Sequence, residues 1–194
     1  FKESVSITEK ILYAIDEGTI KNVDELIVRV HPVHVIHEER DDTIQKLYEI
    51  QKKYPNVLKV MKPKMKKLDV GYDFSESDLN DLISCISNSD VLITQYSTLF
   101  LEGAILNKPI VNIGFDKLDK IDLTSYEACR RLTHIDWISP YNFTKTAINH
   151  SDMIRIIKGI LLGAMLVVST ITVFFTDGTP YWNDIAFIMW CLTI

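Results

Sequence analysis

The order of apolar runs along the chain constrains its fold more than any other feature. Within residues 1–158, short β-branched runs alternate with longer amphipathic stretches. The runs at 25–30, 57–61, 90–94 and 109–113 are typical of strands, and a weaker fifth covers 135–138. Strands separated by helix-length segments pair in parallel through right-handed crossovers. The alternation therefore predicts an α/β fold, with a Rossmann-like parallel sheet and flanking helices.

Apolar residues at helical spacing predict three helices between these strands. The first is expected to end near Tyr54, which precedes a proline. The second has Ser75 and Asp78 at the spacing of a capping box. The residues that mark the three helix faces are Ile44, Leu47, Tyr48 and Gln51; Leu79, Leu82, Ile83 and Ile86; and Phe100, Leu101, Ala104 and Ile105.

The charge content changes after Lys158, which predicts a first domain over residues 1–158 and a distinct segment over 159–194. Residues 159–175 carry no charge and would form an apolar helix of roughly 25 Å, against about 30 Å for the hydrocarbon core of a bilayer. This predicts a membrane segment; the alternative is a buried helix of a soluble core. Basic residues precede the run, which places residues 1–158 at the cytoplasmic face of the cell membrane.

Composition and motif content exclude several classes of protein. The net charge of −5 argues against a nucleic-acid partner. Cys85, Cys129 and Cys191 are far apart and form no CxxC pair, which fits neither a disulfide framework nor a zinc site. The chain has no GxGxxG, Walker, GxSxG or HExxH motif. Because it begins at Phe1 and stops within an apolar run, we expect a fragment of a longer protein.

The loop Thr94–Thr98 follows the third expected strand and opens a helix. Ser97 or Thr98 would cap that helix, which leaves backbone amides and the positive end of the helix dipole facing the loop. A helix N-terminus of this kind binds anions, and the hydroxyl groups add hydrogen-bond donors for a phosphate. Glu102 lies about one turn further on, from where it would accept hydrogen bonds from two ribose hydroxyls. The alternative is an ordinary capped helix with a solvated glutamate.

Two further residues follow strands that end at the same edge of the expected sheet, where ligands bind in folds of this type. His31 follows the first strand and precedes Pro32. It would donate a hydrogen bond to a phosphate or take part in proton transfer; the alternative is a strand cap. Asp116 follows the fourth strand, where it would bind a sugar or cap the next segment.

A cluster of histidines and a cluster of lysines are both expected to be exposed to solvent. His31, His34 and His37 have a spacing that suggests a metal site, but no cysteine or carboxylate group supports it, so no metal is expected. His150 is expected to be structural. Lys62–Lys67 is predicted to be a solvated loop; the alternative is a contact with a membrane surface or an acidic acceptor.

Residues 81–116 (DLISCISNSDVLITQYSTLFLEGAILNKPIVNIGFD) resemble the C-terminal domain of GT-B glycosyltransferases. The resemblance is closest to the CDP-glycerol glycerophosphotransferase and capsule or teichoic-acid polymerase group. Members of that group have a helix, an Asp-Val strand, a T-D-Y-S-S loop, an acidic residue and a Lys-Pro-Ile strand in this order. The Arg29–Pro32 segment resembles their R-x-H-P sequence, and the whole resemblance covers about residues 25–157.

The resemblance implies a donor-binding site formed by these segments. Ser97 and Thr98 would contact the donor diphosphate, Glu102 would bind the ribose or an equivalent polyol, and His31 would lie near the donor phosphates as the catalytic candidate. The other residues that the resemblance assigns to donor binding are Arg29, Gln95, Tyr96 and Asp116. Gln95 stands where the group usually has Asp, which leaves the identity of the donor open.

The activity implied is transfer of a glycosyl or glycerophosphate group from a CDP- or UDP-linked donor to a surface-polysaccharide or lipid-linked acceptor. No cofactor and no obligatory metal are expected. The acceptor site and the general base would belong to an N-terminal domain outside this sequence. Two alternatives stay open: a UDP-sugar 2-epimerase-like enzyme, and a non-catalytic, membrane-tethered module that binds nucleotide sugars.

Overall fold

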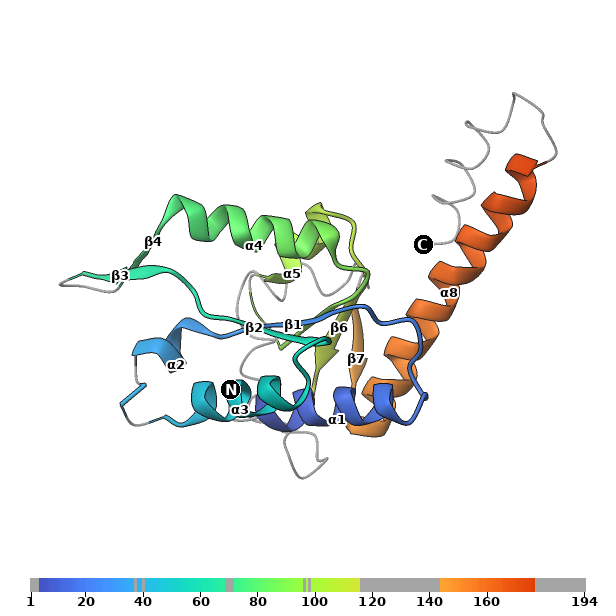
Figure 1. Ribbon diagram of the computed structural model, residues 1–194. Coiled ribbons are helices and arrows are strands. Elements are labelled where there is room, and N and C mark those ends of the chain that lie inside the picture. The colour runs from blue at the N-terminus through green and yellow to red at the C-terminus, as the bar shows by residue number, and fades with distance from the viewer. Residues whose placement is uncertain are drawn as a thin grey trace. The chain divides into compact units, whose positions relative to one another are not determined.

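A computed structural model describes residues 4–36, 38–39, 41–68, 72–95, 97, 99–115 and 144–176 (Figure 1). The chain divides into two compact units, Phe1–Lys158 and Gly159–Ile194. The strands and the candidate site residues all belong to the first unit.

The strands of the first unit form two parallel sheets and one antiparallel hairpin. β1 (Leu26–Arg29) pairs in parallel with β2 (Leu58–Met61). β5 (Leu92–Thr94), β6 (Ile110–Ile113) and β7 (Thr144–Ala147) form a parallel sheet with β6 in the centre. β3 (Met65–Lys67) and β4 (Tyr72–Phe74) form the hairpin. The predicted α/β fold with parallel strands is confirmed, and the Rossmann-like arrangement of one sheet remains a prediction.

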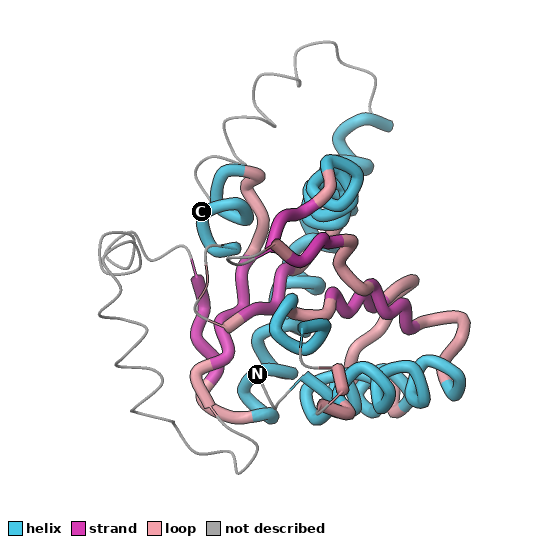
Figure 2. The backbone as a smooth tube through the Cα atoms, turned by 90° about the vertical axis from the view of Figure 1, so that its left-hand side faces the viewer, coloured by secondary structure: helices cyan, strands magenta, loops and turns pink. Residues whose placement is uncertain are grey.

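Described helices lie between β1 and β2, between β2 and β5, and between β5 and β6 along the chain; Figure 2 colours helices cyan and strands magenta. The helices in the described residues are α1 (Ser4–Asp16), α2 (Pro32–Ile36), α3 (Thr43–Lys53), α4 (Glu76–Asn88), α5 (Leu99–Ile105) and α8 (His150–Thr176). The three helices expected from apolar spacing correspond to α3, α4 and α5. α3 ends one residue before Tyr54, as the following proline predicts.

Helices α1 and α3 form the core beside the β1–β2 sheet. Leu12 of α1 packs with Ile50 of α3 and Leu58 of β2 in one cluster. Val30, which directly follows β1, packs with Ile44 and Leu47 in a second cluster. The buried positions of α3 recur at three- and four-residue spacing, so one face of the helix covers the sheet.

The three-stranded sheet is packed closely by α5. All four residues of β6 are buried, as expected of a central parallel strand. A Cβ atom at Gly103 would lie 2.8 Å from Leu92 Cδ2 and 2.9 Å from Ile110 Cδ1. The missing side chain at this position therefore allows α5 to approach β5 and β6 directly.

His150 connects the start of α8 to the rest of the first unit. Its side chain is buried, and Nε2 lies 3.1 Å from Ser6 Oγ of α1. Its ring meets the ring of Phe115 edge to face, with 4.8 Å between centroids. The contacts agree with the structural role expected for this histidine.

Several local expectations differ from the structure. Residues 65–67 form strand β3 and not a solvated loop, and they pair with Tyr72–Phe74. Leu79 and Ile83 of α4, expected on the core-facing side of the helix, are 46% and 53% exposed. The weak strand expected at 135–138 lies outside the described residues.

Among the residues that the structure describes, no helix combines the length and the apolar character needed to cross a membrane. The membrane segment and the location at the cytoplasmic face remain predictions from the sequence.

Candidate functional site

The candidate site residues lie on loops that follow β1 and β5. β1 ends at Arg29, and His31 directly precedes α2. β5 ends at Thr94, and Gln95 and Ser97 precede α5. Both loops therefore lie at the carboxyl ends of parallel strands, where ligands bind in α/β sheets. The two strands belong to different sheets, so the proximity of His31 to Ser97 remains a prediction.

Ser97 closes the turn between β5 and α5. Its Oγ accepts a hydrogen bond from the Leu99 backbone N–H at 3.3 Å, and its carbonyl accepts from the Phe100 N–H at 3.1 Å. Thr94 Oγ1 lies 3.2 Å from Ser97 Oγ. The end of the strand and the start of the helix are thus connected by two hydroxyl groups, as predicted for a capping serine.

Glu102 of α5 carries a buried carboxylate oxygen. Its Oε2 atom is buried, and among the described residues no hydrogen-bond partner reaches it. Burial raises the pKa of the Glu102 carboxyl, because desolvation penalises the charged form. A buried acceptor without a partner is costly, so this carboxyl is not an ordinary solvated glutamate.

Arg29, which the resemblance assigns to the donor, is engaged in an ion pair. Its Nη2 lies 2.5 Å from Asp78 Oδ2, and the two side chains are 19% and 2% exposed. Asp78 Oδ1 also accepts a hydrogen bond from the Lys64 backbone N–H at 2.7 Å. The Asp78 N–H donates to Ser75 Oγ at 3.2 Å, which confirms the predicted helix start. Arg29 thus fixes the end of β1 against α4, and sequence reasoning missed its partner.

His31 directly precedes α2, and its neighbours cover it only in part. Partial burial of the ring, followed by the neighbouring charge of His34, lowers the pKa of His31. The ring is therefore neutral at pH 7 and carries one N–H donor and one acceptor nitrogen. This state suits either donation to a phosphate oxygen or acceptance of a proton.

His34 is not the solvated loop residue that the sequence predicts. It is 3% exposed on α2, and its Nδ1 lies 2.5 Å from Asp41 Oδ2. Asp41 Oδ1 accepts from the Thr43 backbone N–H at 2.8 Å, which satisfies the first N–H of α3. These hydrogen bonds, from Thr43 first and then from His34, hold the pKa of Asp41 well below its usual range. A single carboxylate thus joins α2 to α3.

Three assigned residues, Tyr96, Thr98 and Asp116, lie outside the described residues, as does His37. Within the part of the chain that is described, no group of three or more His, Cys, Asp or Glu side chains is placed to hold a metal ion.

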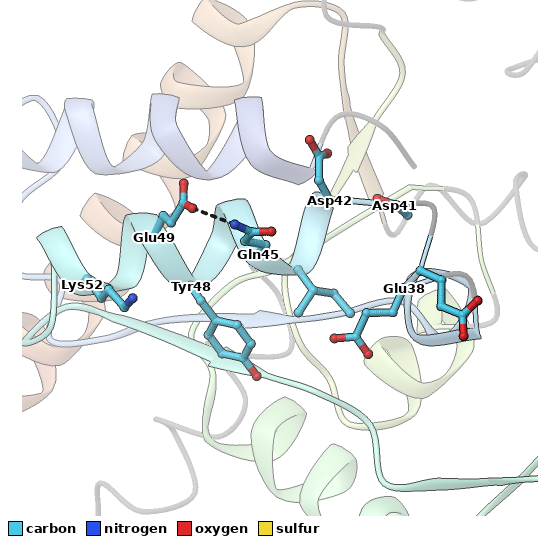
Figure 3. A pocket seen from close by; sticks show the side chains of 9 residues that line it. Glu38, Asp41, Asp42, Gln45, Tyr48, Glu49 and Lys52 are labelled. Carbon is cyan, nitrogen blue, oxygen red and sulfur yellow. Dashed lines mark hydrogen bonds between the residues drawn. The ribbon is translucent and has the colours of Figure 1, made fainter.

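An open pocket lies beside α3 and the segment that precedes it (Figure 3). Five carboxylates line it: Glu38, Glu39, Asp41, Asp42 and Glu49. A pocket of this charge repels a diphosphate, and none of its lining residues comes from the loops after β1 and β5. It is therefore not the donor site.

Comparison with known proteins identifies a family for this chain. A family profile described as CDP-Glycerol:Poly(glycerophosphate) glycerophosphotransferase matches residues 20–164, which is more than half of the chain. No curated protein and no solved structure gives a significant match. The matched range contains the candidate loops and both parallel sheets. It supports a transferase of cell-wall polymer synthesis that uses a nucleotide-activated donor. The resemblance inferred from residues 81–116 is thereby confirmed, and the chain belongs to the family of CDP-glycerol:poly(glycerophosphate) glycerophosphotransferases.

Proposed function

We propose that this chain supplies the donor-binding part of a transferase that moves glycerophosphate from CDP-glycerol to a poly(glycerophosphate) acceptor. The observation that carries the proposal is the family match over residues 20–164, which spans the loops after β1 and β5. The positions of Ser97 and Glu102 support it, because both follow β5 at the carboxyl end of a parallel strand.

In this proposal an acceptor hydroxyl attacks the phosphorus that carries the glycerol. The acceptor hydroxyl gives its proton to a general base in the acceptor-binding part of the transferase, a new P–O bond forms to the acceptor, the anhydride P–O bond breaks, and CMP leaves with the negative charge. Ser97 and Thr98 stabilise that charge with hydroxyl donors, and neutral His31 donates an N–H to a phosphate oxygen. Glu102 accepts hydrogen bonds from hydroxyls of the ribose, and its Oε2 has no hydrogen-bond partner among the described residues.

Calorimetry with CDP-glycerol tests the binding step. The double variant Ser97→Ala with Thr98→Ala is expected to lose about 1–3 kcal/mol of binding free energy, because two hydrogen bonds to a charged group disappear. The exposed Ser84 of α4 offers a matched control, since Ser84→Ala removes a hydroxyl that belongs to neither loop. Equal affinity of the double variant and the wild type would remove the β5–α5 loop from the site.

The role of Glu102 is tested with the sugar of the donor. Glu102→Ala is expected to weaken binding of CDP-glycerol strongly, but to change little for an analogue that lacks both ribose hydroxyls, because that analogue offers no donor to the carboxylate. Equal losses for the two ligands would leave Glu102 as a structural residue.

A further inference from the structure

The Asp78 carboxylate is held in place by backbone groups. The residue lies in the first turn of α4, and its side chain is 2% exposed. Its Oδ1 accepts from the Lys64 backbone N–H at 2.7 Å, and its own backbone N–H donates to Ser75 Oγ at 3.2 Å. The Ser75 N–H in turn donates to the Lys64 carbonyl at 3.2 Å. These bonds fix the side chain, and Oδ2 remains available for a further donor.

That donor is the guanidinium of Arg29, whose Nη2 lies 2.5 Å from Asp78 Oδ2. A guanidinium carries five N–H groups, and Asp78 is the hydrogen-bond partner that the structure gives this one among the described residues. The Arg29 side chain is 19% exposed, so it is not closed off from a ligand. The pair therefore combines an immobilised cation with N–H groups that Asp78 does not use.

The pair lies at the edge of the sheet where ligands bind in parallel α/β folds. Arg29 is the last residue of β1 and is in register with Met61, the last residue of β2. Lys64 follows Met61 in the chain, and His31 follows Arg29. Asp78 thus joins the carboxyl end of β1 to the segment that leaves the carboxyl end of β2.

Stability does not require charges at this contact. Apolar side chains of similar volume replace buried ion pairs with little loss of stability. An immobilised arginine does favour the recognition of phosphate, because its planar fork can donate two parallel hydrogen bonds without first losing side-chain freedom. The ion pair therefore has a use in binding that an apolar contact between β1 and α4 would lack.

We propose that Asp78 is a positioning residue for donor binding: it orients the Arg29 guanidinium so that the remaining N–H groups hold a phosphate of the nucleotide-activated donor. Asp78 does not touch the donor and acts through Arg29. The inference rests on the proposed function, which supplies the phosphate ligand. It adds to that function a residue of α4, which belongs to neither of the loops after β1 and β5.

The double variant Arg29→Met with Asp78→Leu separates positioning from a purely structural role. It removes both charges but retains apolar packing, so its melting temperature should lie close to that of the wild type. CDP-glycerol should nevertheless bind about 10- to 100-fold more weakly, because charge-assisted hydrogen bonds to phosphate are lost. Cytidine, which has no phosphate, should bind equally to both proteins in an NMR titration.

Three outcomes of this comparison overturn the proposal. The first is binding of CDP-glycerol by the double variant within twofold of the wild type, which means that the pair only connects β1 to α4. The second is a melting temperature that falls together with the affinity. The third is an equal loss for cytidine, which means that the phosphate contact is not what the substitutions remove.

Asp78→Glu tests the positioning step while Arg29 is still present. The variant keeps the negative charge but moves the carboxylate by one methylene, about 1.5 Å, so the guanidinium stays paired and is displaced. Affinity for CDP-glycerol should fall about tenfold, since small misplacements of a binding group are costly. Binding within twofold of the wild type by the folded variant overturns the role of Asp78.

Lys59→Met with Glu25→Leu is the matched control, because it removes an exposed ion pair between β2 and the residue that precedes β1. It should bind CDP-glycerol within twofold of the wild type, and a loss as large as that of the test variant overturns the proposal. If the wild type does not bind CDP-glycerol, the proposed function fails and this inference fails with it. If the wild type binds and the Arg29→Met, Asp78→Leu variant binds equally, the proposed function stands and the inference alone is overturned.

Discussion

Replacement of Asp78 by asparagine is expected to be among the most destabilising single changes in the described part of the chain. The Asp78 side chain is 2% exposed and accepts from both the Arg29 guanidinium and the Lys64 backbone N–H. An asparagine at this position retains the volume and one acceptor oxygen, but its amide hydrogens would face the donors of Arg29. The variant leaves a guanidinium that is only 19% exposed without a counter-charge.

The magnitude follows from the burial of the pair. Removal of one partner from a buried ion pair costs about 3–5 kcal/mol, because the remaining charge stays desolvated. With a urea m-value of about 2 kcal/mol per molar, the midpoint of unfolding should fall by roughly 1.5–2.5 M. The double variant Arg29→Met with Asp78→Leu should recover most of the loss, since apolar residues of similar volume replace buried pairs with little cost.

Urea titrations followed by far-UV circular dichroism measure these midpoints. Asp81→Asn is the control: it breaks the ion pair with Lys64, in which the two side chains are 62% and 40% exposed, and should leave the midpoint unchanged. A loss below about 1 kcal/mol for Asp78→Asn would show that the buried pair does not hold β1 to α4. A double variant no more stable than the single one would contradict the desolvation argument.

Three further predictions concern packing and titration. Gly103→Ala places a methyl group against Leu92 and Ile110 and should cost about 1–3 kcal/mol in urea unfolding; an unchanged midpoint would mean that α5 does not pack closely. The pKa of Glu102 is higher in the folded protein than in the unfolded chain. The free energy of unfolding therefore falls as pH rises through the range between these two pKa values. Glu102→Gln should reduce the difference between midpoints at pH 4 and pH 7, and an identical difference argues against burial of the carboxyl. Asp41→Ala removes the hydrogen bonds to the Thr43 N–H and to His34, and it should lower the free energy of unfolding by about 1 kcal/mol at pH 7. Because the pKa of Asp41 is lower in the folded protein than in the unfolded chain, the stability lost in Asp41→Ala should become smaller as pH falls below about 4. A loss that does not change with pH would contradict an ionised Asp41 in the folded protein.

The sequence predicts the parallel strands well where apolar runs are continuous. The runs at 25–30, 57–61, 90–94 and 109–113 correspond to β1, β2, β5 and β6, with ends that agree within about two residues. These strands are short, rich in β-branched residues, and followed by Pro, Gly or polar loops, so the local signal and the tertiary environment agree. β7 has the sequence TKTA, which lacks such a run, and its strand conformation comes from its pairing with β6.

Only part of the candidate site could be predicted from the sequence. The hydrogen bond from the Leu99 N–H to Ser97 Oγ was predictable, because a hydroxyl before an apolar helix is a local capping signal, whereas the role of Ser97 in donor binding remains a prediction. The partner of Arg29 was missed, since Asp78 lies 49 residues away and its local position already explained it as a helix-start residue. The alignment of Thr94, Asn112 and Thr146 was missed for the same reason, because these residues become neighbours only through strand register.

The order of strands in the β5–β6–β7 sheet has a consequence for biosynthesis. β6 is central, and its second neighbour begins at Thr144, 31 residues after β6 ends at Ile113. As the chain leaves the ribosome from its N-terminus, a buried apolar strand therefore presents an open hydrogen-bonding edge until β7 emerges. Truncation before Thr144 would make that edge permanent, so shortened chains should form aggregates that include β6, whereas chains extended past Ala147 should not.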